Sequence, residues 1–464
     1  MGQSMLPAGH HVPSISSGPY PLRHGNRVRP LVDGEPAFRR ICEAVEAASD
    51  SVWVTVAFMS RDFAMPDGRG SLFDVLDAAV ARGLDVRVIF WRHTLLEQIK
   101  PGTHYSGTEP ERQALADRGS RFHAVWDQAD GNYCQHQKSW LVDAGTEGEI
   151  AFVGGINLGQ DSTVPVGHPA TDGGNVHDVY LELQGPSGTD VHHNFVQRWN
   201  GASDRQQPDG RFPADVEPGL LAFPTRPSEP RGEVPVQIQR TVRAGRYTDD
   251  TATPGGEPFA IERGDKTILA QYLAALQAAK HTIYVEDQAI GYAPVVDALH
   301  DALRRGVQVV FLVPAEPNQD MVKARTDPKA KAFFDSLTAL DDHAHFTLVG
   351  IASPREDGEL QNIYVHAKIA LVDDHWCTVG STNIAARSFH GDTELNASFW
   401  CTKAVRAFRV ELLAEHLGRD TSDLDDRGAL SLYAEIARDN AARRARGDAL
   451  SGLAFALEAS TYGA

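Results

Sequence analysis

Two stretches of the chain carry the same chemically active residue types at the same spacing. In each, a histidine precedes a lysine by two positions, an aspartate follows after four intervening residues, and a turn of the form Gly-(Gly/Ser)-x-Asn comes later. The first set is His136, Lys138, Asp143, Gly154, Gly155 and Asn157, and the second is His366, Lys368, Asp373, Gly380, Ser381 and Asn383. Two such matches 230 residues apart indicate a shared origin and a shared role.

The chemistry that these residue types can perform is phosphoryl transfer. Lysine is a compact cation with three donors, and asparagine amides, the Ser381 hydroxyl and the backbone N–H groups of a glycine-rich turn can bind the same oxyanion. Histidine can attack phosphorus when it is neutral, and it can protonate a leaving oxygen when it is charged. If both sets meet at one interface, they form a phosphodiesterase site that requires no metal.

The stretch IYVHAKIALVDD, residues 363–374, has the pattern of a buried β-strand. Side chains two positions apart on a strand share a face, so we expect His366 and Lys368 to project together toward the phosphate. Asp143 and Asp373 differ in parity from the histidines and lysines. We therefore expect both aspartates on the other face of their strands, in a structural role.

Helix and strand patterns alternate in both halves of the chain. In the first half, helical spacing aligns Phe38, Ile41, Val45 and Ala48, then Leu72, Val75, Leu76 and Ala79, with strands expected at 52–56 and 86–90. In the second half it aligns Leu269, Tyr272, Leu273 and Leu276, with strands expected at 282–285 and 307–313. We predict an α/β fold of two similar αβ repeats, each a mixed β-sheet flanked by helices. The repeats are expected to pack about a pseudo-two-fold axis, with the active site at their interface.

A proline-rich segment separates the two halves. Seven prolines within residues 201–235 argue against a long regular element there. The predicted organisation is an N-terminal extension (1–30), a first repeat (31–202), a linker (203–234), a second repeat (235–420) and a C-terminal helical tail (421–464). The tail has the pattern of an amphipathic charged helix that packs on the protein, with membrane contact as a less favoured alternative.

Composition narrows the possible partners. The 464 residues include 44 Lys and Arg against 62 Asp and Glu, a formal net charge of −18, which disfavours general nucleic-acid binding. Neither a signal-peptide core near the amino terminus nor an apolar run long enough to cross a bilayer is evident. We expect a cytoplasmic or peripheral membrane location, or secretion if a leader has been removed.

Three further histidines follow the first motif and raise the question of a metal site. His177, His192 and His193 show no ligand spacing, and the four cysteines are widely separated, so the sequence favours no metal ligand and no cofactor. We expect His177 beside the site and the adjacent pair on a helix surface. Glu286 and Gln288 share a strand face and either line the pocket or bind neighbouring backbone groups.

The duplicated motif resembles that of the phospholipase D superfamily, His-x-Lys-x4-Asp followed by Gly-(Gly/Ser)-x-Asn. The segments HTIYVEDQAI (281–290), HQKSWLVD (136–143), VHDVYLELQGPSGTDVHHNFVQRWN (176–200) and AFRVELLAEHLG (407–418) look like those of true phospholipases D. The resemblance covers roughly residues 30 to 420. The chain departs from the family pattern in one stretch, because the segment between Asp143 and Gly154 is longer than its counterpart after Asp373. No calcium-dependent membrane module is evident, so the resemblance does not imply calcium dependence.

The resemblance implies a role for each motif residue. His136 would be the nucleophile that forms a phosphohistidine, and His366 the general acid and later the base. Lys138, Lys368, Asn157 and Asn383 would hold the phosphoryl oxygens, together with Gly155 and Ser381. In the family each histidine is oriented by a downstream carboxylate, and Asp178 and Glu394 occupy the matching places.

Three functions remain open at this point. The first is a phospholipase D that hydrolyses phosphatidylcholine-like lipids and transfers the phosphatidyl group to alcohols. The second is a synthase of the cardiolipin or phosphatidylserine type, and the third is a nucleic-acid phosphodiesterase, which the negative charge disfavours. We expect a monomer that meets phospholipid at a membrane surface and uses water or an alcohol as acceptor. Candidate lipid-facing loops are 59–70 and 315–331.

Overall fold

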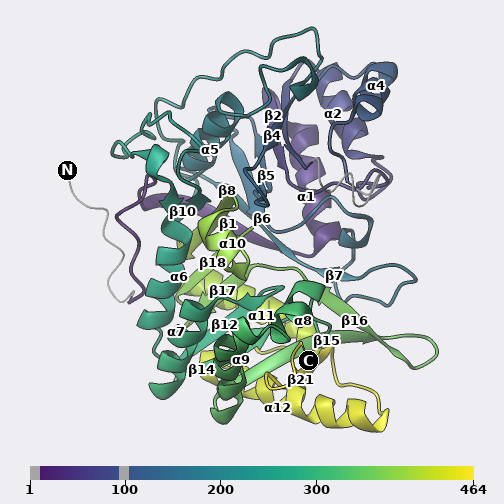
Figure 1. Ribbon diagram of the computed structural model, residues 1–464, viewed down its shortest axis with the longest axis vertical. Helices are drawn as coiled ribbons and strands as arrows, with labels where there is room; N and C mark the ends of the chain where they lie inside the picture. Colours follow the sequence, from purple (N-terminus) through teal and green to yellow (C-terminus); the bar gives the residue numbers. More distant parts are fainter. Residues whose placement is uncertain (1–10, 94–103, 464) are drawn as a thin grey trace.

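The computed structural model describes residues 11–93 and 104–463. Residues 1–10 of the predicted N-terminal extension lie outside this range. The first half of the chain occupies the upper part of Figure 1 and the second half the lower part, with β-strands running through the middle of both. The α/β fold class is therefore confirmed.

The first half is built on a mixed sheet. Its strands are β1 (Arg23–Val32), β2 (Ser51–Val56), β3 (Asp85–Arg92), β4 (His123–Gln128), β5 (Ser139–Val142), β6 (Ile150–Gly154), β7 (Val176–His177), β8 (Val179–Gln184) and β9 (Arg211–Phe212). The spatial order is β9-β4-β3-β2-β5-β6-β8-β1, in which β2, β3 and β4 are parallel and the remaining pairs are antiparallel. The two expected strands of this half, β2 and β3, are present.

The second half repeats this strand order. Its strands are β10 (Val234–Val242), β11 (Asp265–Lys266), β12 (Thr282–Glu286), β13 (Ile290–Gly291), β14 (Gln308–Leu312), β15 (Phe346–Pro354), β16 (Leu360–Val365), β17 (Ile369–Val372), β18 (Trp376–Gly380), β19 (Ile384–Ala385), β20 (Glu394–Trp400) and β21 (Ala454–Leu457). The order is β15-β14-β12-β17-β18-β20-β10, again parallel in β12, β14 and β15 and antiparallel elsewhere. Equivalent strands of the two halves therefore carry equivalent motif residues.

Strand β1 joins the two sheets. Residues 27–32 pair with β8, whereas Arg23 and Asn26 pair with β10 of the second half. The strand begins inside the segment that the sequence placed in the N-terminal extension. One apolar core takes residues from both halves, including Leu181 and Val379, so the halves share a buried interface.

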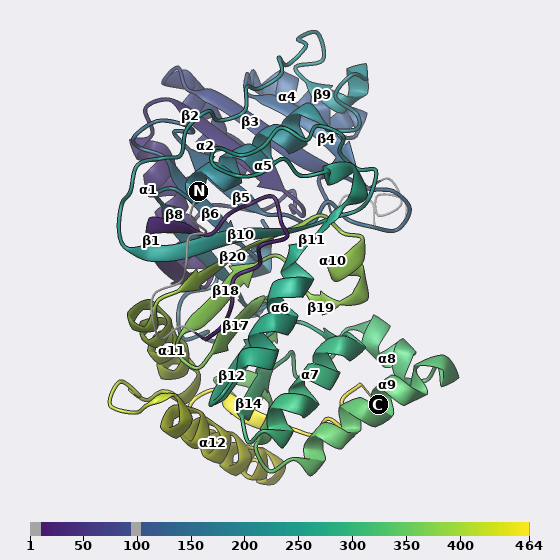
Figure 2. The same ribbon diagram turned by 90° about the vertical axis from the view of Figure 1, so that its left-hand side faces the viewer.

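Helices cover the faces of both sheets, as Figures 1 and 2 show. In the first half they are α1 (Gly34–Ala47), α2 (Leu72–Ala81), α4 (Glu109–Arg118) and α5 (Gly188–Asn200). In the second half they are α6 (Thr267–Ala278), α7 (Ala293–Arg304), α8 (Gln319–Arg325), α9 (Lys331–Thr338), α10 (Ala386–His390), α11 (Thr402–Leu417) and α12 (Asp426–Arg446). No helix among residues 11–93 and 104–463 combines the length and the apolar character needed to cross a bilayer.

Most residues that the sequence placed on buried helical faces are buried in the structure, and a few are not. In α2 all four expected positions are buried, and Gly83 follows at φ 89, a backbone conformation that glycine adopts without strain. Ala48 falls just after α1 instead of within it. In α6, Leu269 and Leu273 are only half-buried, because the side facing the core carries Tyr272 and Leu276.

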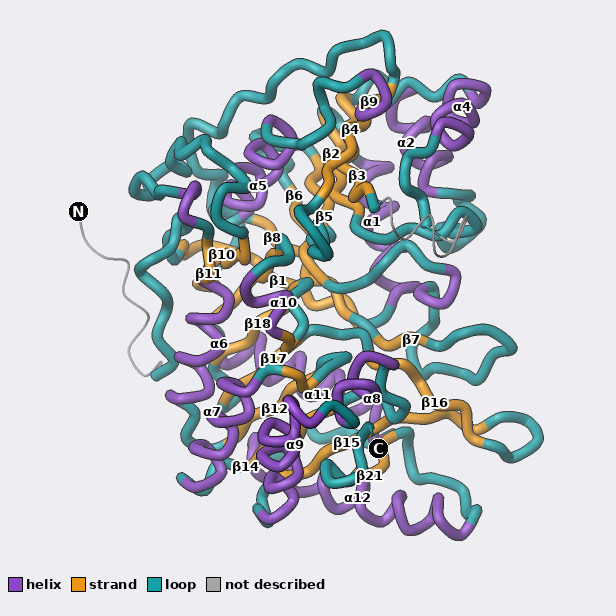
Figure 3. Tube along the Cα trace, in the orientation of Figure 1, coloured by secondary structure: helices purple, strands orange, loops and turns teal. Residues whose placement is uncertain are grey.

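The proline-rich segment covers α5. Figure 3 shows the residues between β9 and β10 as a long loop along the edge of the first half. Trp199 and Asn200 of α5 donate hydrogen bonds to the carbonyl groups of Gly219 and Leu221 in this loop. The expectation that His192 and His193 lie on a helix surface is therefore wrong, because both are buried beneath chain that the local sequence pattern could not place.

The C-terminal tail packs on the second half. Helix α12 buries one side, which includes Leu430 and Tyr433, and it contacts β12 and β14. The chain then returns as β21, which pairs antiparallel with β15. The tail thus contributes a strand to the sheet in addition to its helix.

The two motif aspartates fix the strands that carry the motifs. The Asp143 carboxylate accepts hydrogen bonds from the backbone N–H groups of Ser49, Asp50 and Ser51, where β2 begins. The Asp373 carboxylate accepts from the N–H groups of Lys280, His281 and Thr282, where β12 begins. Each aspartate therefore anchors the end of its motif strand to the neighbouring central strand.

We predict that Asp143→Ala and Asp373→Ala destabilise the fold. Each change leaves three backbone N–H groups without their acceptor, one of them on a buried residue, so the free energy of unfolding should fall by about 2–3 kcal/mol. Urea unfolding followed by circular dichroism measures the change. Asp335→Ala is a matched control, because Asp335 is an exposed carboxylate paired only with Lys331 on the surface of α9. Unfolding free energies equal to that of the control variant would contradict the anchoring role.

Candidate active site

The motif histidines lie at breaks between strands. Strand β16 ends at Val365 and β17 begins at Ile369, so residues 366–368 belong to neither strand. The expectation of one continuous strand over IYVHAKIALVDD is wrong, because β16 pairs with β15 and β7 while β17 pairs with β12 and β18. His136 likewise precedes β5. The break exposes both imidazoles to one cavity.

Each motif histidine is bound by a carboxylate of the other repeat. Nδ1 of His136 lies 3.0 Å from both carboxylate oxygens of Glu394, and Nδ1 of His366 lies 2.5 Å from Oδ2 of Asp178. The downstream carboxylates identified from the sequence are thus the right residues, but their pairing is exchanged between the repeats. Because Nδ1 is engaged, Nε2 is the ring atom left for chemistry.

Equivalent backbone contacts produce this exchange. Gln135 forms a parallel bridge with Thr393, which places His136 beside Glu394. In the other repeat, β16 pairs in parallel with β7, and Val365 lies opposite His177, one residue before Asp178. The chain of each repeat therefore enters the site alongside the carboxylate-bearing strand of the other.

The two lysines are buried next to the histidines. Nζ of Lys138 donates to the carbonyl oxygen of His136 at 2.8 Å, and Nζ of Lys368 donates to that of His366. Burial lowers the pKa of Lys138 to about 8 and also lowers the pKa of Lys368. Neither lysine is among the residues that line the cavity. Both cations nevertheless lie immediately behind the imidazoles, where they add positive potential.

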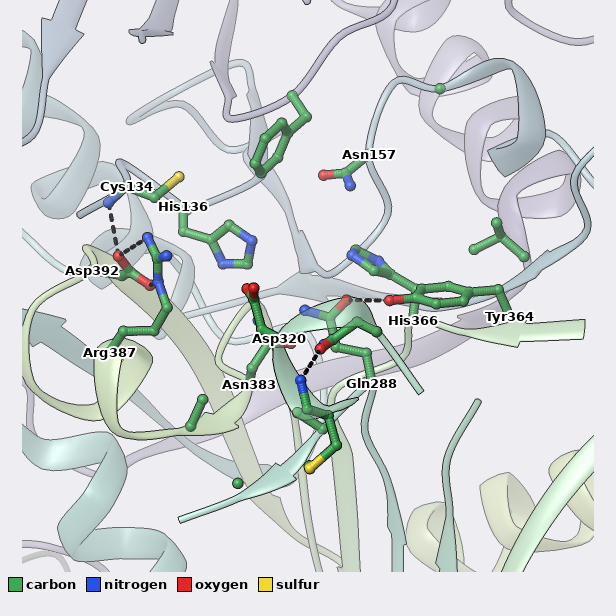
Figure 4. A pocket seen from close by; sticks show the side chains of 18 of the residues that line it. Cys134, His136, Asn157, Gln288, Asp320, Tyr364, His366, Asn383, Arg387 and Asp392 are labelled. Carbon is green, nitrogen blue, oxygen red and sulfur yellow. Dashed lines mark hydrogen bonds and ion pairs between the residues drawn. The ribbon is translucent and has the colours of Figure 1, made fainter. Parts of the chain in front are cut away.

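The two motif asparagines do line the cavity. Asn157 follows β6 and Asn383 follows β18, and both side chains face the space between the halves (Figure 4). Within the described chain, Oδ1 of each amide is buried without a hydrogen-bond partner. Because these oxygens are acceptors, an oxyanion in the cavity would be bound by the Nδ2–H donors of the same two amides.

Gly155 and Ser381 take a different place from the one expected. Their backbone N–H groups donate to the carbonyl oxygens of Val179 and Leu395, so they are not available to a phosphate. The Ser381 hydroxyl donates to Oε2 of Glu394 at 2.6 Å. A Cβ atom on Gly155 would fall 2.4 Å from Oδ1 of Asp178. Both residues therefore position the carboxylates and do not contact the cavity.

The cavity has a volume of about 1050 Å³ and is lined by both halves. Figure 4 shows the His136 and His366 rings turned toward the same space. Apolar side chains form much of the remaining wall, and they are Phe58, Met59, Trp91, Leu158, Val176, Met321, Phe333 and Phe334. The cavity thus joins a polar centre to apolar walls, as is common in small-molecule sites.

Sequence reasoning missed a charged group at the edge of the cavity. Arg387 donates two hydrogen bonds to Asp392, and Asp392 accepts from the backbone N–H of Cys134 (Figure 4). The ion pair with Asp392 raises the pKa of Arg387. Arg387 lies four residues after Asn383 of the second motif. The sequence could have revealed it as a cation close to the glycine-rich turn.

The sequence left open whether Glu286 and Gln288 line the cavity, and the structure places them differently. Gln288 lines the cavity and accepts a hydrogen bond from the Tyr364 hydroxyl. Glu286 lies away from the cavity and accepts from Nε2 of His177 at 2.9 Å. The two candidate loops each contribute to the lining, through Met59 and Ser60 in 59–70 and through several residues of 315–331, including Met321.

Comparisons with known proteins agree with the motif. Residues 272–414 match the family model described as "Cardiolipin synthase, PLD-like domain". The chain is 23% identical over 500 residues to "Phospholipase D A" of Dictyostelium discoideum, and the match covers 86% of this chain and 36% of that protein. It is 22% identical over 393 residues to "Cardiolipin synthase 1" of Staphylococcus aureus (strain MRSA252), covering 84% of this chain and 67% of that protein. These matches support the resemblance of this chain to the phospholipase D superfamily.

A solved structure has the same fold. The phosphatidylserine synthase of Haemophilus influenzae Rd KW20 superposes with a TM-score of 0.58 and 12% sequence identity, over 94% of this chain and 98% of that one. The chain spans about a third of the Dictyostelium relative, at 36%, and about two thirds of the staphylococcal one, at 67%.

Burial favours the uncharged forms of the catalytic candidates. It lowers the pKa of His136 well below its usual range, and the Lys138 ammonium lowers it further. Burial and Lys368 lower the pKa of His366 to about 4, against the opposing effect of Asp178. Burial also raises the pKa of Glu394 to about 7. An anion in the cavity would raise the pKa of both histidines, against the effect of burial, because negative charge stabilises an imidazolium.

We predict that the cavity binds inorganic phosphate through the two asparagines. Asn157→Ala and Asn383→Ala should each weaken phosphate binding by up to about tenfold, the effect of losing one hydrogen bond to an anion. Isothermal titration calorimetry measures the change. Asn362→Ala is the control, because the Asn362 amide is exposed and bonded to Glu316 and Arg444 outside the cavity. Unchanged affinity in both cavity variants would place the anion elsewhere.

Proposed function

We propose that this protein is a phospholipase D that hydrolyses glycerophospholipid phosphodiesters to phosphatidic acid and transfers the phosphatidyl group to alcohols. The observation that carries the proposal is the pair of imidazoles on one cavity, each held at Nδ1 by a carboxylate of the other repeat. Two histidines in this arrangement supply one nucleophile and one general acid. A pseudo-two-fold relation between the repeats, inferred from their equal strand order, accounts for the pairing.

The proposed reaction has two steps. In the first, Nε2 of His136 attacks phosphorus, the bond from phosphorus to the head-group oxygen breaks, and Nε2–H of His366 gives its proton to that oxygen. In the second, His366 takes a proton from water or an alcohol, whose oxygen attacks phosphorus and breaks the phosphorus–nitrogen bond. The charge on the phosphoryl oxygens is balanced by the Asn157 and Asn383 amides and by the two lysines behind the histidines. The scheme uses no metal ion in the chemistry.

The walls of the cavity support a lipid substrate. Its apolar side chains suit acyl chains or glycerol carbon atoms, and Arg387 at the edge suits a phosphate or an anionic head group. On α8, Met321 lines the cavity while Val322, the next residue, is 40% exposed. We propose that 315–331 meets the lipid surface. The net charge of −18 disfavours a nucleic-acid substrate.

A second candidate function is that of a phosphatidyltransferase. Relatives include proteins named cardiolipin synthase, and the structural neighbour is a phosphatidylserine synthase. The same two-step chemistry would serve, with an alcohol in place of water as the dominant acceptor. The two candidate functions differ only in the acceptor that attacks the phosphohistidine, which is water or an alcohol.

Product analysis distinguishes these functions. We predict that phosphatidylcholine yields phosphatidic acid, and that added ethanol diverts the product to phosphatidylethanol, as measured by mass spectrometry of extracted lipids. His136→Asn should abolish turnover and the covalent phosphoenzyme. A product formed only with glycerol-containing lipid or serine as acceptor would favour the synthase. Inertness toward lipids, with nuclease activity present, would contradict both, and phosphohistidine retained in His136→Asn would overturn the assignment of the nucleophile.

The pairing of each histidine with a carboxylate of the other repeat predicts which side of the pH–activity profile, acidic or basic, each carboxylate controls. Activity requires neutral His136 and protonated His366, so it is lost at low pH as His136 gains a proton and at high pH as His366 loses one. Removing a carboxylate lowers the pKa of the histidine it contacts. Glu394→Gln should therefore move the acidic limb to lower pH, and Asp178→Asn should move the basic limb to lower pH. Each should also reduce kcat by about 10²–10⁴-fold.

Profiles of kcat and kcat/KM against pH measure both limbs. Glu182→Gln serves as a control, because this buried carboxylate binds Arg40 and lies outside the cavity. The opposite result, with Asp178→Asn moving the acidic limb, would contradict the assignment of His136 as the nucleophile and His366 as the general acid.

A further inference from the structure

A second cluster of buried histidines and carboxylates lies outside the cavity. Its members are Asp33 before α1, His168 in the loop between β6 and β7, His177 in β7 and Glu415 in α11. One ligand atom of each lies within 4.8 Å of the corresponding atoms of the others. None of the four is among the residues that line the cavity. The catalytic scheme leaves this cluster without a role.

The hydrogen bonds of His168 direct one lone pair into the cluster. Nδ2 of Asn175 donates to the carbonyl oxygen of His168, which fixes the orientation of the amide. Oδ1 of Asn175 is then the acceptor for Nδ1–H of His168, at 2.7 Å. In the neutral ring Nε2 therefore carries no hydrogen. This atom points at His177 and Asp33.

His177 is held in the complementary way. Its Nε2 lies 2.9 Å from Oε2 of Glu286, which fixes the proton on that nitrogen. Nδ1 is left to face the cluster, 3.2 Å from Nε2 of His168 and 2.9 Å from Oδ1 of Asp33. A histidine whose outer nitrogen donates to a carboxylate is the usual arrangement of a metal ligand.

These three atoms form a triangle whose edges are somewhat shorter than those of one face of a metal coordination tetrahedron. Nε2 of His168 lies 3.1 Å from Oδ1 of Asp33, which completes a triangle with edges of 2.9, 3.1 and 3.2 Å. Ligands about 2.0–2.1 Å from a tetrahedral zinc ion are about 3.3–3.4 Å apart. Three electron-rich atoms this close, without a cation or proton between them, repel one another.

Glu415 supplies the fourth position. Its Oε1 accepts from the backbone N–H of Gly167 at 2.6 Å and lies 3.8 Å from Nε2 of His168. Its Oε2 lies 3.9 Å from Nδ1 of His177 and is buried without a hydrogen-bond partner in the described chain. Oδ2 of Asp33 is buried and unpartnered in the same way. Unpaired carboxylate oxygens are costly in the interior, so the cluster favours a cation.

A proton satisfies this cluster less completely than a metal ion. Although burial opposes it, Glu286 and Asp33 raise the pKa of His177 well above its usual range, so a proton on Nδ1 is one way to bridge His177 and Asp33. That proton leaves the unpartnered oxygens of Asp33 and Glu415 as they are. A divalent ion contacts all four residues at once and offsets more of the buried negative charge.

We propose that Asp33, His168, His177 and Glu415 bind a divalent transition-metal ion of the zinc type. Two imidazoles and two carboxylates form a ligand set that zinc accepts, and with all four positions filled by protein the site is closed and structural. The outer contacts from Asn175, Glu286 and Gly167 orient the ligands. The expectation that His177 belongs to no metal site is replaced by this proposal.

The ion would hold the strand that presents Asp178 to the catalytic site. The carbonyl oxygen of His177 accepts from the backbone N–H groups of His366 and Ala367, at 2.8 and 3.1 Å. Three of the proposed ligands come from the first half and Glu415 from the second. Binding would therefore fasten the two halves together next to the general acid, without contact with the substrate.

The metal content of the full-length protein tests the proposal independently of any lipid activity. Protein produced in zinc-supplemented medium and dialysed at neutral pH should retain about one zinc ion per chain by mass spectrometry of the metal. Protein loaded with Co²⁺ instead should show the intense visible absorption of a tetrahedral site. Glu415→Gln and His168→Gln should each weaken zinc binding by at least about tenfold.

A matched variant separates this effect from the loss of any buried histidine. His192→Gln removes a buried histidine of α5 that contacts Glu149, outside the cluster, and should retain zinc. Zinc should raise Tm of the wild type and of His192→Gln, but not of Glu415→Gln. Wild-type protein that retains no zinc after dialysis, and gives no tetrahedral Co²⁺ spectrum, would overturn the proposal in favour of a protonated cluster. This outcome is decided on wild-type protein even if a variant fails to fold.

Discussion

The contact on which the active site depends is the histidine–carboxylate pair formed across the two repeats. Neither repeat contains a complete pair, because Glu394 reaches back to His136 and Asp178 reaches forward to His366. The site therefore exists only when the halves are docked in one register. Two short parallel contacts, Gln135 with Thr393 and Val365 with His177, set that register.

Most of the surrounding structure keeps these pairs in place. The repeated strand order brings β8 and β20 to the middle, and the Asp143 and Asp373 carboxylates tie the motif strands to β2 and β12. Small residues complete the support. Gly155 leaves room for the Asp178 carboxylate, and the corresponding Ser381 donates its hydroxyl to the longer Glu394 side chain. The two halves thus reach the same imidazole geometry with different acids.

The electrostatics of the site follow from its burial. Histidine, lysine and carboxylate groups are enclosed together, and burial shifts each of their pKa values toward the neutral form. Under the proposed function the cavity takes up a substrate anion, whereas the buried cluster around His177 would take up the proposed cation. The two are linked along the chain, because His177 of the cluster immediately precedes Asp178 of the site.

The sequence alone determined which chemically active residue types recur and at what spacing. Identical spacing in two places identified the histidines, lysines and asparagines, and helical or strand periodicity located α2, β2, β12 and β14 because such patterns are local. Tertiary structure decided what depends on distant chain. This includes the exchanged acids, the place of Ser381 behind the site, the burial of His192 and the meeting of His168 with Glu415. Contacts between residues far apart in sequence leave no periodic signal, so only the packing of the two halves reveals them.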